Sequence, residues 1–171
     1  MSDSLRVQLG LTMLKAEQAR RKINSSLVWM PFPGSPQEAA LNSPADEIFY
    51  GGAAGGGKTD LLLGLAVTQH RNSIIFRREY PQLSGLIQRS REVLSSTGAR
   101  YNGMEKVWRD IPGGRRLEFG AVQYEKDKYK FQGRAHDLKG FDELPNFTKT
   151  QYEYLKGWAR TAEPGQRATG S

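Results

Sequence analysis

Two groups of residues have the types and the spacing that phosphate chemistry needs. The first is the loop GAAGGGKT at residues 52–59, which fits the pattern G-x-x-x-x-G-K-[ST] between an apolar stretch and a leucine-rich stretch. Its glycines reach positive φ without a Cβ clash, so successive backbone N–H groups can converge on a phosphate. A helix that starts near Lys58 adds unpaired N–H groups and the positive end of its dipole. The spacing therefore predicts an anion site built mainly from backbone.

The side chains at the end of this loop complete the expected site. Lys58 would neutralise β- and γ-phosphate oxygens, and the hydroxyl of Thr59 would be a ligand for Mg²⁺. The alternative is a flexible glycine-rich turn that precedes Lys-Thr by chance. The cofactor-binding candidates of the loop are Gly52, Ala53, Ala54, Gly55, Gly56, Gly57, Lys58, Thr59 and Asp60.

The second group is the acid pair Asp142-Glu143, far along the chain from the loop. Hydrolysis needs a metal ligand and a group that orients water. At the end of a strand beside the loop strand, Asp142 could reach Mg²⁺ through water and Glu143 could polarise the attacking water. The alternative is an acidic turn before the helix that follows Thr148. Lys139 does not fit a buried strand, which is usually apolar throughout, so it must find solvent or a partner.

Alternating strands and helices are expected to position these two groups. The elements indicated by the sequence are a short turn at 37–41, strands at 48–50, 73–76 and just before residue 142, helices over 58–67, 81–98 and 125–130, a hairpin of 107–111 with 115–119, and a helix capped at Thr148. Because strand and helix alternate, the sheet should be α/β in type and largely parallel.

Length and composition indicate one domain with a basic surface. The chain has 171 residues, with 25 Lys and Arg against 18 Asp and Glu, and a net charge of +7 favours polyanionic partners. No Cys is present, which excludes thiolate metal sites, and no apolar run is long enough to span a membrane. We expect a soluble intracellular protein with a basic helical arm at 1–30, a phosphate-binding domain at 31–162 and a flexible tail at 163–171. The arm would contact nucleic acid or a partner, or else be a solvated segment that packs on the domain.

Five blocks in this order resemble the ATPase domain of the large terminase subunits of tailed bacteriophages. They are PQEAAL at 36–41, YGGAAGGGKTDLLL at 50–63, IIFRREYPQL at 74–83, the PGG turn at 112–114 and FQGRAHDLKGFDEL at 131–144. The resemblance covers about residues 31–160. It implies a P-loop NTPase fold of the additional-strand, catalytic-glutamate type, with a mostly parallel central sheet flanked by helices.

The resemblance also implies roles for single residues. Gln37 is similar to the glutamine that reads adenine, and Lys58 and Thr59 to the residues that bind phosphate and Mg²⁺. Asp142 is similar to the acid on the metal side, and Glu143 to the catalytic glutamate.

The chain departs from the family inside the loop. Many members have an arginine where this chain has Ala53 and Ala54, so the charge of the transition state must be neutralised by another residue. Arg77, Arg78 and Arg134 are the candidates, and a finger that reaches a neighbouring subunit would be Arg134. The alternatives are a pair at the sheet edge for the first two and a loop cation for Arg134.

The implied function is an ATP-binding and ATP-hydrolysing motor domain that powers the translocation of double-stranded DNA into the capsid. Its cofactors would be ATP and Mg²⁺, and its partners non-specific DNA, the small terminase subunit and further copies in a ring on the capsid portal. It would work in the host cytoplasm, docked on the procapsid, without a membrane.

Other functions remain open from the sequence. The family's coupling segment and nuclease domain are not expected in this chain, and without a later acidic cluster we expect no nuclease activity. The alternative function is a nucleotide-gated assembly or DNA-binding module that binds ATP without efficient turnover. A helicase, a small-molecule kinase or a GTPase is disfavoured, since helicase blocks, an acceptor-binding lid and an N-K-x-D sequence are not apparent.

Overall fold

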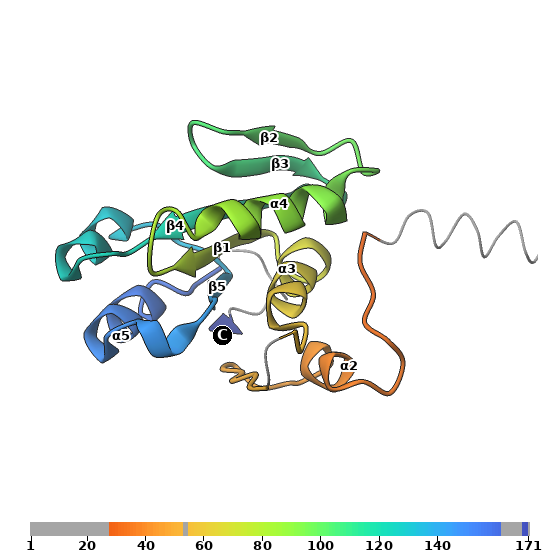
Figure 1. The fold of residues 1–171 in the computed structure, drawn as a ribbon, viewed down its shortest axis with the longest axis horizontal. Coiled ribbons are helices and arrows are strands. Elements are labelled where there is room, and N and C mark those ends of the chain that lie inside the picture. The colour runs from red at the N-terminus through yellow and green to blue at the C-terminus, as the bar shows by residue number, and fades with distance from the viewer. Residues whose placement is uncertain (1–27, 53–54, 162–168, 171) are drawn as a thin grey trace, which may run out of the picture.

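A six-stranded sheet in the order β2-β3-β4-β1-β5-β6 forms the centre of the computed structural model (Figure 1). The structure describes residues 28–52, 55–161 and 169–170. The strands are β1 (Asn72–Arg77), β2 (Arg100–Asn102), β3 (Val107–Ile111), β4 (Arg115–Ala121), β5 (Leu138–Phe141) and β6 (Thr169–Gly170). The helices are α2 (Pro36–Leu41), α3 (Lys58–Thr68), α4 (Leu83–Leu94) and α5 (Lys149–Lys156), with the 3₁₀ helices η1 (Glu125–Phe131) and η2 (Leu144–Asn146).

The sheet is mixed, so the expectation of a mostly parallel sheet is too strong. Strands β4, β1, β5 and β6 pair in parallel, whereas β2, β3 and β4 pair antiparallel. The predicted hairpin is present as β3 and β4, and its short turn forces an antiparallel pair. Parallel neighbours instead need a crossover, which α4 provides between β1 and the hairpin strands.

Helices cover both faces of the sheet, which confirms the α/β class. Because successive strand residues point to opposite faces, Ile75 of β1 packs into the core under α3 and α4. Its neighbours Ile74 and Phe76 pack into a second core with Phe131 of η1 and Leu155 of α5. The residues of α4 belong to the first core and those of α5 to the second, and Figure 1 shows α4 crossing near β4 while α5 lies apart from it at the lower left.

The helix that follows the loop is buried almost all round, as its sequence predicts. Its residues from Leu61 to Val67 are all buried. At Gly64 of α3 a Cβ would come within 2.3 Å of the ring of Trp29. Glycine at this position therefore lets Trp29 pack closely against α3. The start of α3 is therefore fixed relative to the sheet by packing on several sides.

One expected strand near the start of the domain is wrong. Residues 48–50 line a pocket and do not pair with a neighbouring strand in the described part of the chain. Within the expected flexible tail at 163–171, Thr169–Gly170 form β6, which pairs in parallel with β5. Residues 163–168 and 171 of that tail, and residues 1–27 of the expected arm at 1–30, lie outside the described residues.

The segment expected as an exposed helix at 125–130 is the 3₁₀ helix η1, and three of its residues, among them Asp127 and Phe131, are buried. Within the residues that the structure describes, no helix is long and apolar enough to cross a membrane.

Candidate functional site

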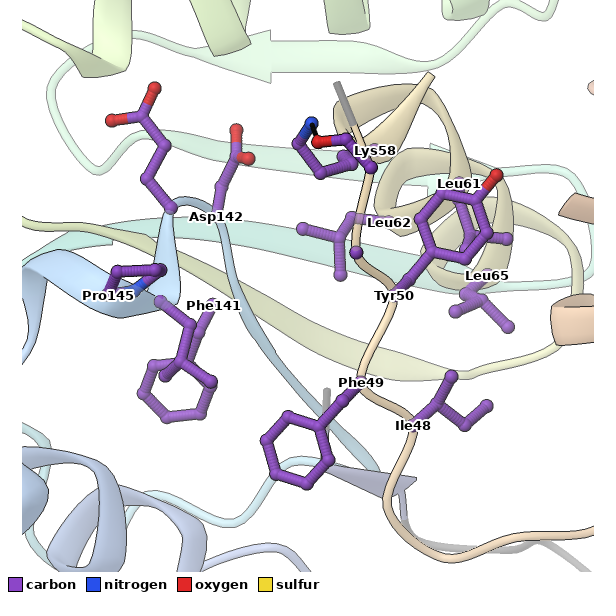
Figure 2. A pocket seen from close by; sticks show the side chains of 14 residues that line it. Ile48, Phe49, Tyr50, Lys58, Leu61, Leu62, Leu65, Phe141, Asp142 and Pro145 are labelled. Atoms are coloured by element: carbon purple, nitrogen blue, oxygen red, sulfur yellow. Dashed lines mark hydrogen bonds between the residues drawn. The ribbon is translucent and has the colours of Figure 1, made fainter. Parts of the chain in front are cut away.

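A pocket of about 400 Å³ lies between the loop segment and the end of β5. One wall is formed by residues 48–52 and the first turns of α3, and the other by residues 141–145. Figure 2 shows Lys58 and Asp142 together at one end of the pocket, with Ile48, Phe49 and Phe141 at the other. The pocket thus joins a charged end, suited to phosphates, to an apolar end, suited to a flat organic group.

The two residue groups predicted from the sequence meet at one hydrogen bond. The hydroxyl of Thr59 donates to Oδ2 of Asp142 at 3.0 Å, across 83 positions of sequence. Thr59 lies in the first turn of α3, and Asp142 directly follows β5, with its backbone N–H bonded to the carbonyl of Phe76. The sheet and the helix therefore place a hydroxyl and a carboxylate where both could reach one cation.

The N-terminus of α3 opens on this site without a side-chain cap. Its N-cap is Gly57, at φ 71. The amide of Gln37 donates to the carbonyl of Gly57 at 2.8 Å, and a Cβ at Gly57 would lie 2.3 Å from that amide nitrogen. Glycine is thus needed here both for its φ and for the approach of Gln37. Nζ of Lys58 donates to the carbonyl of Gly52 at 2.8 Å, so the lysine folds back over its own loop.

Arg77 joins the two acids, a role that the sequence did not assign. Its Nε and Nη2 donate to Oδ2 of Asp142 at 2.9 and 2.7 Å. Its Nη1 lies 3.1 Å from Oε1 of Glu143. The register pairs Phe76 with Phe141 on parallel strands, so the residues that follow them come together. A sequence signal existed, because a charged residue directly follows each of two strands expected to be parallel.

Glu143 has an unusual backbone, with φ 60 and ψ 51 in the left-handed region. A non-glycine residue in that region is strained, and such strain clusters at functional sites. Its carboxylate also accepts from Nδ2 of Asn146 at 3.2 Å, and the side chain is 44% exposed. Glu143 is thus a partly exposed carboxylate among the residues that line the pocket.

Other sequence candidates lie elsewhere. Asp60 forms a two-point ion pair with Arg89 of α4 at 2.7 and 2.9 Å, and Arg78 donates to the side chain of Gln151. Nη2 of Arg134 lies 2.7 Å from Glu118, in a second pocket, so the structure does not bring Arg134 to the acid pair of its own chain. Whether it reaches a second subunit stays a prediction. Ala53 and Ala54 lie outside the described residues.

Lys139 finds its partner in a buried polar cluster. The side chain is fully buried, and Nζ donates to the carbonyl of Arg134 at 3.0 Å and lies 3.0 Å from Nδ1 of His136. Burial lowers the pKa of Lys139 to about 8. Burial would raise the pKa of nearby Glu118, but His136, whose Nε2 lies 3.5 Å from the carboxylate, and the charge of Arg134 hold that pKa below its ordinary value.

Replacing Lys139 with methionine is expected to remove a pH dependence of the free energy of unfolding. The folded chain has a Lys139 pKa of about 8, below the ordinary 10.5, so between these values the unfolded chain binds more protons and the parent becomes more stable as pH rises. A difference of this size corresponds to at most about 3 kcal/mol. Denaturation of both proteins on either side of this window measures it, and identical pH dependence would contradict the account.

The residues present fit a magnesium ion that is shared with a phosphate. Within residues 28–52, 55–161 and 169–170, no group of three or more His, Asp or Glu could hold a metal by itself. Mg²⁺ usually binds through one or two carboxylates plus substrate phosphates and water. Asp142 supplies a carboxylate oxygen and Thr59 a hydroxyl oxygen, and both lie beside the expected phosphate site.

Comparisons of the chain with family models, curated proteins and solved structures each found no match. The likeness to large terminases therefore rests on the sequence blocks given above.

Proposed function

We propose that this chain binds Mg²⁺ and ATP at the loop of residues 52–59 and hydrolyses the bond between the β- and γ-phosphates of ATP. The fold that we propose for it is a P-loop NTPase of the catalytic-glutamate type. The observation that carries the proposal is the bond between Thr59 and Asp142. A phosphate loop alone would support binding, whereas this contact adds an acid pair at the same helix end.

Each side chain has a role that its position allows. Lys58 and the N-terminal amides of α3 bind the phosphates, while Thr59 and Asp142 hold the metal. Mg²⁺, when bound, neutralises charge on the β- and γ-phosphates. Glu143 orients a water molecule and accepts its proton, which suits a carboxylate that is partly exposed at the mouth of the pocket.

The wider role that we propose is the motor domain of a phage large terminase, which moves double-stranded DNA into a capsid. Its support is the resemblance of the five sequence blocks, together with a net charge of +7 that favours a polyanionic track. DNA contacts made by such a surface would be independent of sequence. The small terminase subunit and a ring of copies on the portal belong to the same proposal.

One observation favours the second candidate, a module that binds ATP without efficient turnover. Arg77 pairs with Oδ2 of Asp142 and Oε1 of Glu143, so a guanidinium occupies one oxygen of each acid in this arrangement. A chain that kept this arrangement with nucleotide bound would hold ATP and not cleave it.

Lys58→Ala is expected to weaken the binding of Mg-ATP by about 10- to 100-fold, because charged hydrogen bonds to the phosphates are lost. The backbone amides of α3 remain, so some affinity persists. A fluorescent ATP analogue titrated into each protein measures the change. Lys149→Ala is the matched control, since Lys149 is exposed on α5 and forms an ion pair with Glu153. Equal affinity in Lys58→Ala and the parent would contradict the site.

A further inference from the structure

The guanidinium of Arg77 lies across both carboxylates of the acid pair. Two of its nitrogens bond to one oxygen of Asp142, and the third nitrogen faces Glu143. The same Asp142 oxygen also accepts from Thr59. Three donors thus converge on Oδ2, the atom that sits beside the hydroxyl expected to bind a metal.

We propose that Arg77 is a positioning residue that takes the place of the divalent cation while the site has no nucleotide. It would hold Asp142 and Glu143 side by side and then release them when the metal and nucleotide arrive. This inference rests on the proposed function and goes beyond it. It states that Asp142 and Glu143 become available to metal and water only after Arg77 has been displaced.

Charge and burial support this role. The side chain of Asp142 is 3% exposed and that of Arg77 is 17% exposed. Two neighbouring carboxylates repel each other, and a buried carboxylate without a counter-charge is costly. The side-chain bonds of Arg77 in the described part of the chain go to these two acids alone. One cation therefore stabilises both acids until another replaces it.

The geometry also sets up a competition. A planar guanidinium spans two carboxylates at fixed spacing, which a lysine ammonium does not reproduce. Because Arg77 and Thr59 share Oδ2 of Asp142, a metal bound at that oxygen must displace the guanidinium. Removal of Arg77 should then make metal binding easier and the binding of metal-free ATP harder, since the bare acids would repel the triphosphate.

The first test titrates Mg²⁺ against binding of a fluorescent ATP analogue in the parent, Arg77→Gln and Arg77→Lys. In Arg77→Gln the Mg²⁺ concentration at half-maximal binding should fall by about 10- to 100-fold, and affinity for the metal-free analogue should fall by a similar factor. For Arg77→Lys both quantities should lie between those of the parent and Arg77→Gln, because the positive charge is kept but the planar guanidinium with its several N–H donors is lost. Arg100→Gln, an exposed arginine paired with Asp110, should match the parent. A protein with general damage would lose both affinities together.

The second test titrates Mn²⁺ without nucleotide and follows it by electron paramagnetic resonance. Arg77→Gln should bind Mn²⁺ more tightly than the parent, and the gain should vanish when Asp142→Asn is added. An unchanged Mn²⁺ affinity together with an unchanged Mg²⁺ midpoint overturns the inference while nucleotide binding still stands. If the parent binds no nucleotide but Arg77→Gln gains Mn²⁺ affinity, the proposed function fails and the role of Arg77 stands.

Discussion

Glu143→Gln is expected to bind ATP as tightly as the parent and to release phosphate about 100- to 10,000-fold more slowly, the range for loss of a general base. The substitution keeps the size of the side chain and its contact with Asn146. It leaves Lys58, Thr59 and Asp142 unchanged, so binding and chemistry should separate. Phosphate release at saturating ATP, with binding measured in parallel, gives both quantities.

A matched control is available on α5. Glu153 is an exposed glutamate with an ion pair to Lys149, so Glu153→Gln should keep the parent rate. If Glu143→Gln and the parent release phosphate at the same rate, Glu143 is not the base, and the module that binds ATP without efficient turnover becomes the better account. A loss of ATP binding in Glu143→Gln would instead indicate that its pairing with Arg77 supports the loop.

The parts of the fold that follow local patterns were predictable from the sequence. Strand β1, helices α3 and α4 and the β3–β4 hairpin carry clear apolar patterns or a glycine turn, and the capping pair Thr148 and Gln151 marks the start of α5. The loop pattern and the acid pair predicted that Thr59 and Asp142 would meet, and they do, although the strand expected before the loop at 48–50 is not formed.

The parts that depend on distant pairing were not predictable. Residues 48–50 have strand-like composition, but a strand needs a partner edge, and the described chain does not supply one there. β6 owes its existence to the edge of β5 and not to its own Thr-Gly sequence. The charged residues at the ends of two strands expected to be parallel indicated that Arg77 and the acids lie near one another, but which atoms bond depends on the register of β1 with β5, which no local pattern fixes.

The burial of Lys139 also depends on residues that are distant in sequence. The sequence left open whether it would find solvent or a partner, and the register sets it beside Ile74, with Glu118 on the strand beyond. A buried lysine was therefore accommodated by residues that are distant in sequence. The burial of Lys139 could be predicted only together with the polar residues that surround it, because a buried charge needs a partner.

The amide of Gln151 connects three elements near the site and is fully buried. Its Oε1 accepts from Arg78 and from the N–H of Thr148, the latter at 3.1 Å. Its Nε2 donates to the carbonyls of Val122 at 3.3 Å and Tyr124 at 3.1 Å. Every donor and acceptor of this amide is thus used, and the bonds tie α5 to the ends of β1 and β4.

Gln151→Ala is expected to lower the free energy of unfolding by about 3 kcal/mol or more, because it leaves several buried polar groups without their partner. Gln151→Glu should not restore it, since a carboxylate could still pair with Arg78 but would face two carbonyl oxygens. Urea denaturation measures both, and Gln88→Ala on the exposed face of α4 is the control, with a change within about 0.5 kcal/mol. Because Arg78 directly follows Arg77, a folded Gln151→Ala protein should also show a shifted Mg²⁺ dependence of ATP binding. Wild-type stability in Gln151→Ala would mean that this amide network does not hold α5 to the sheet.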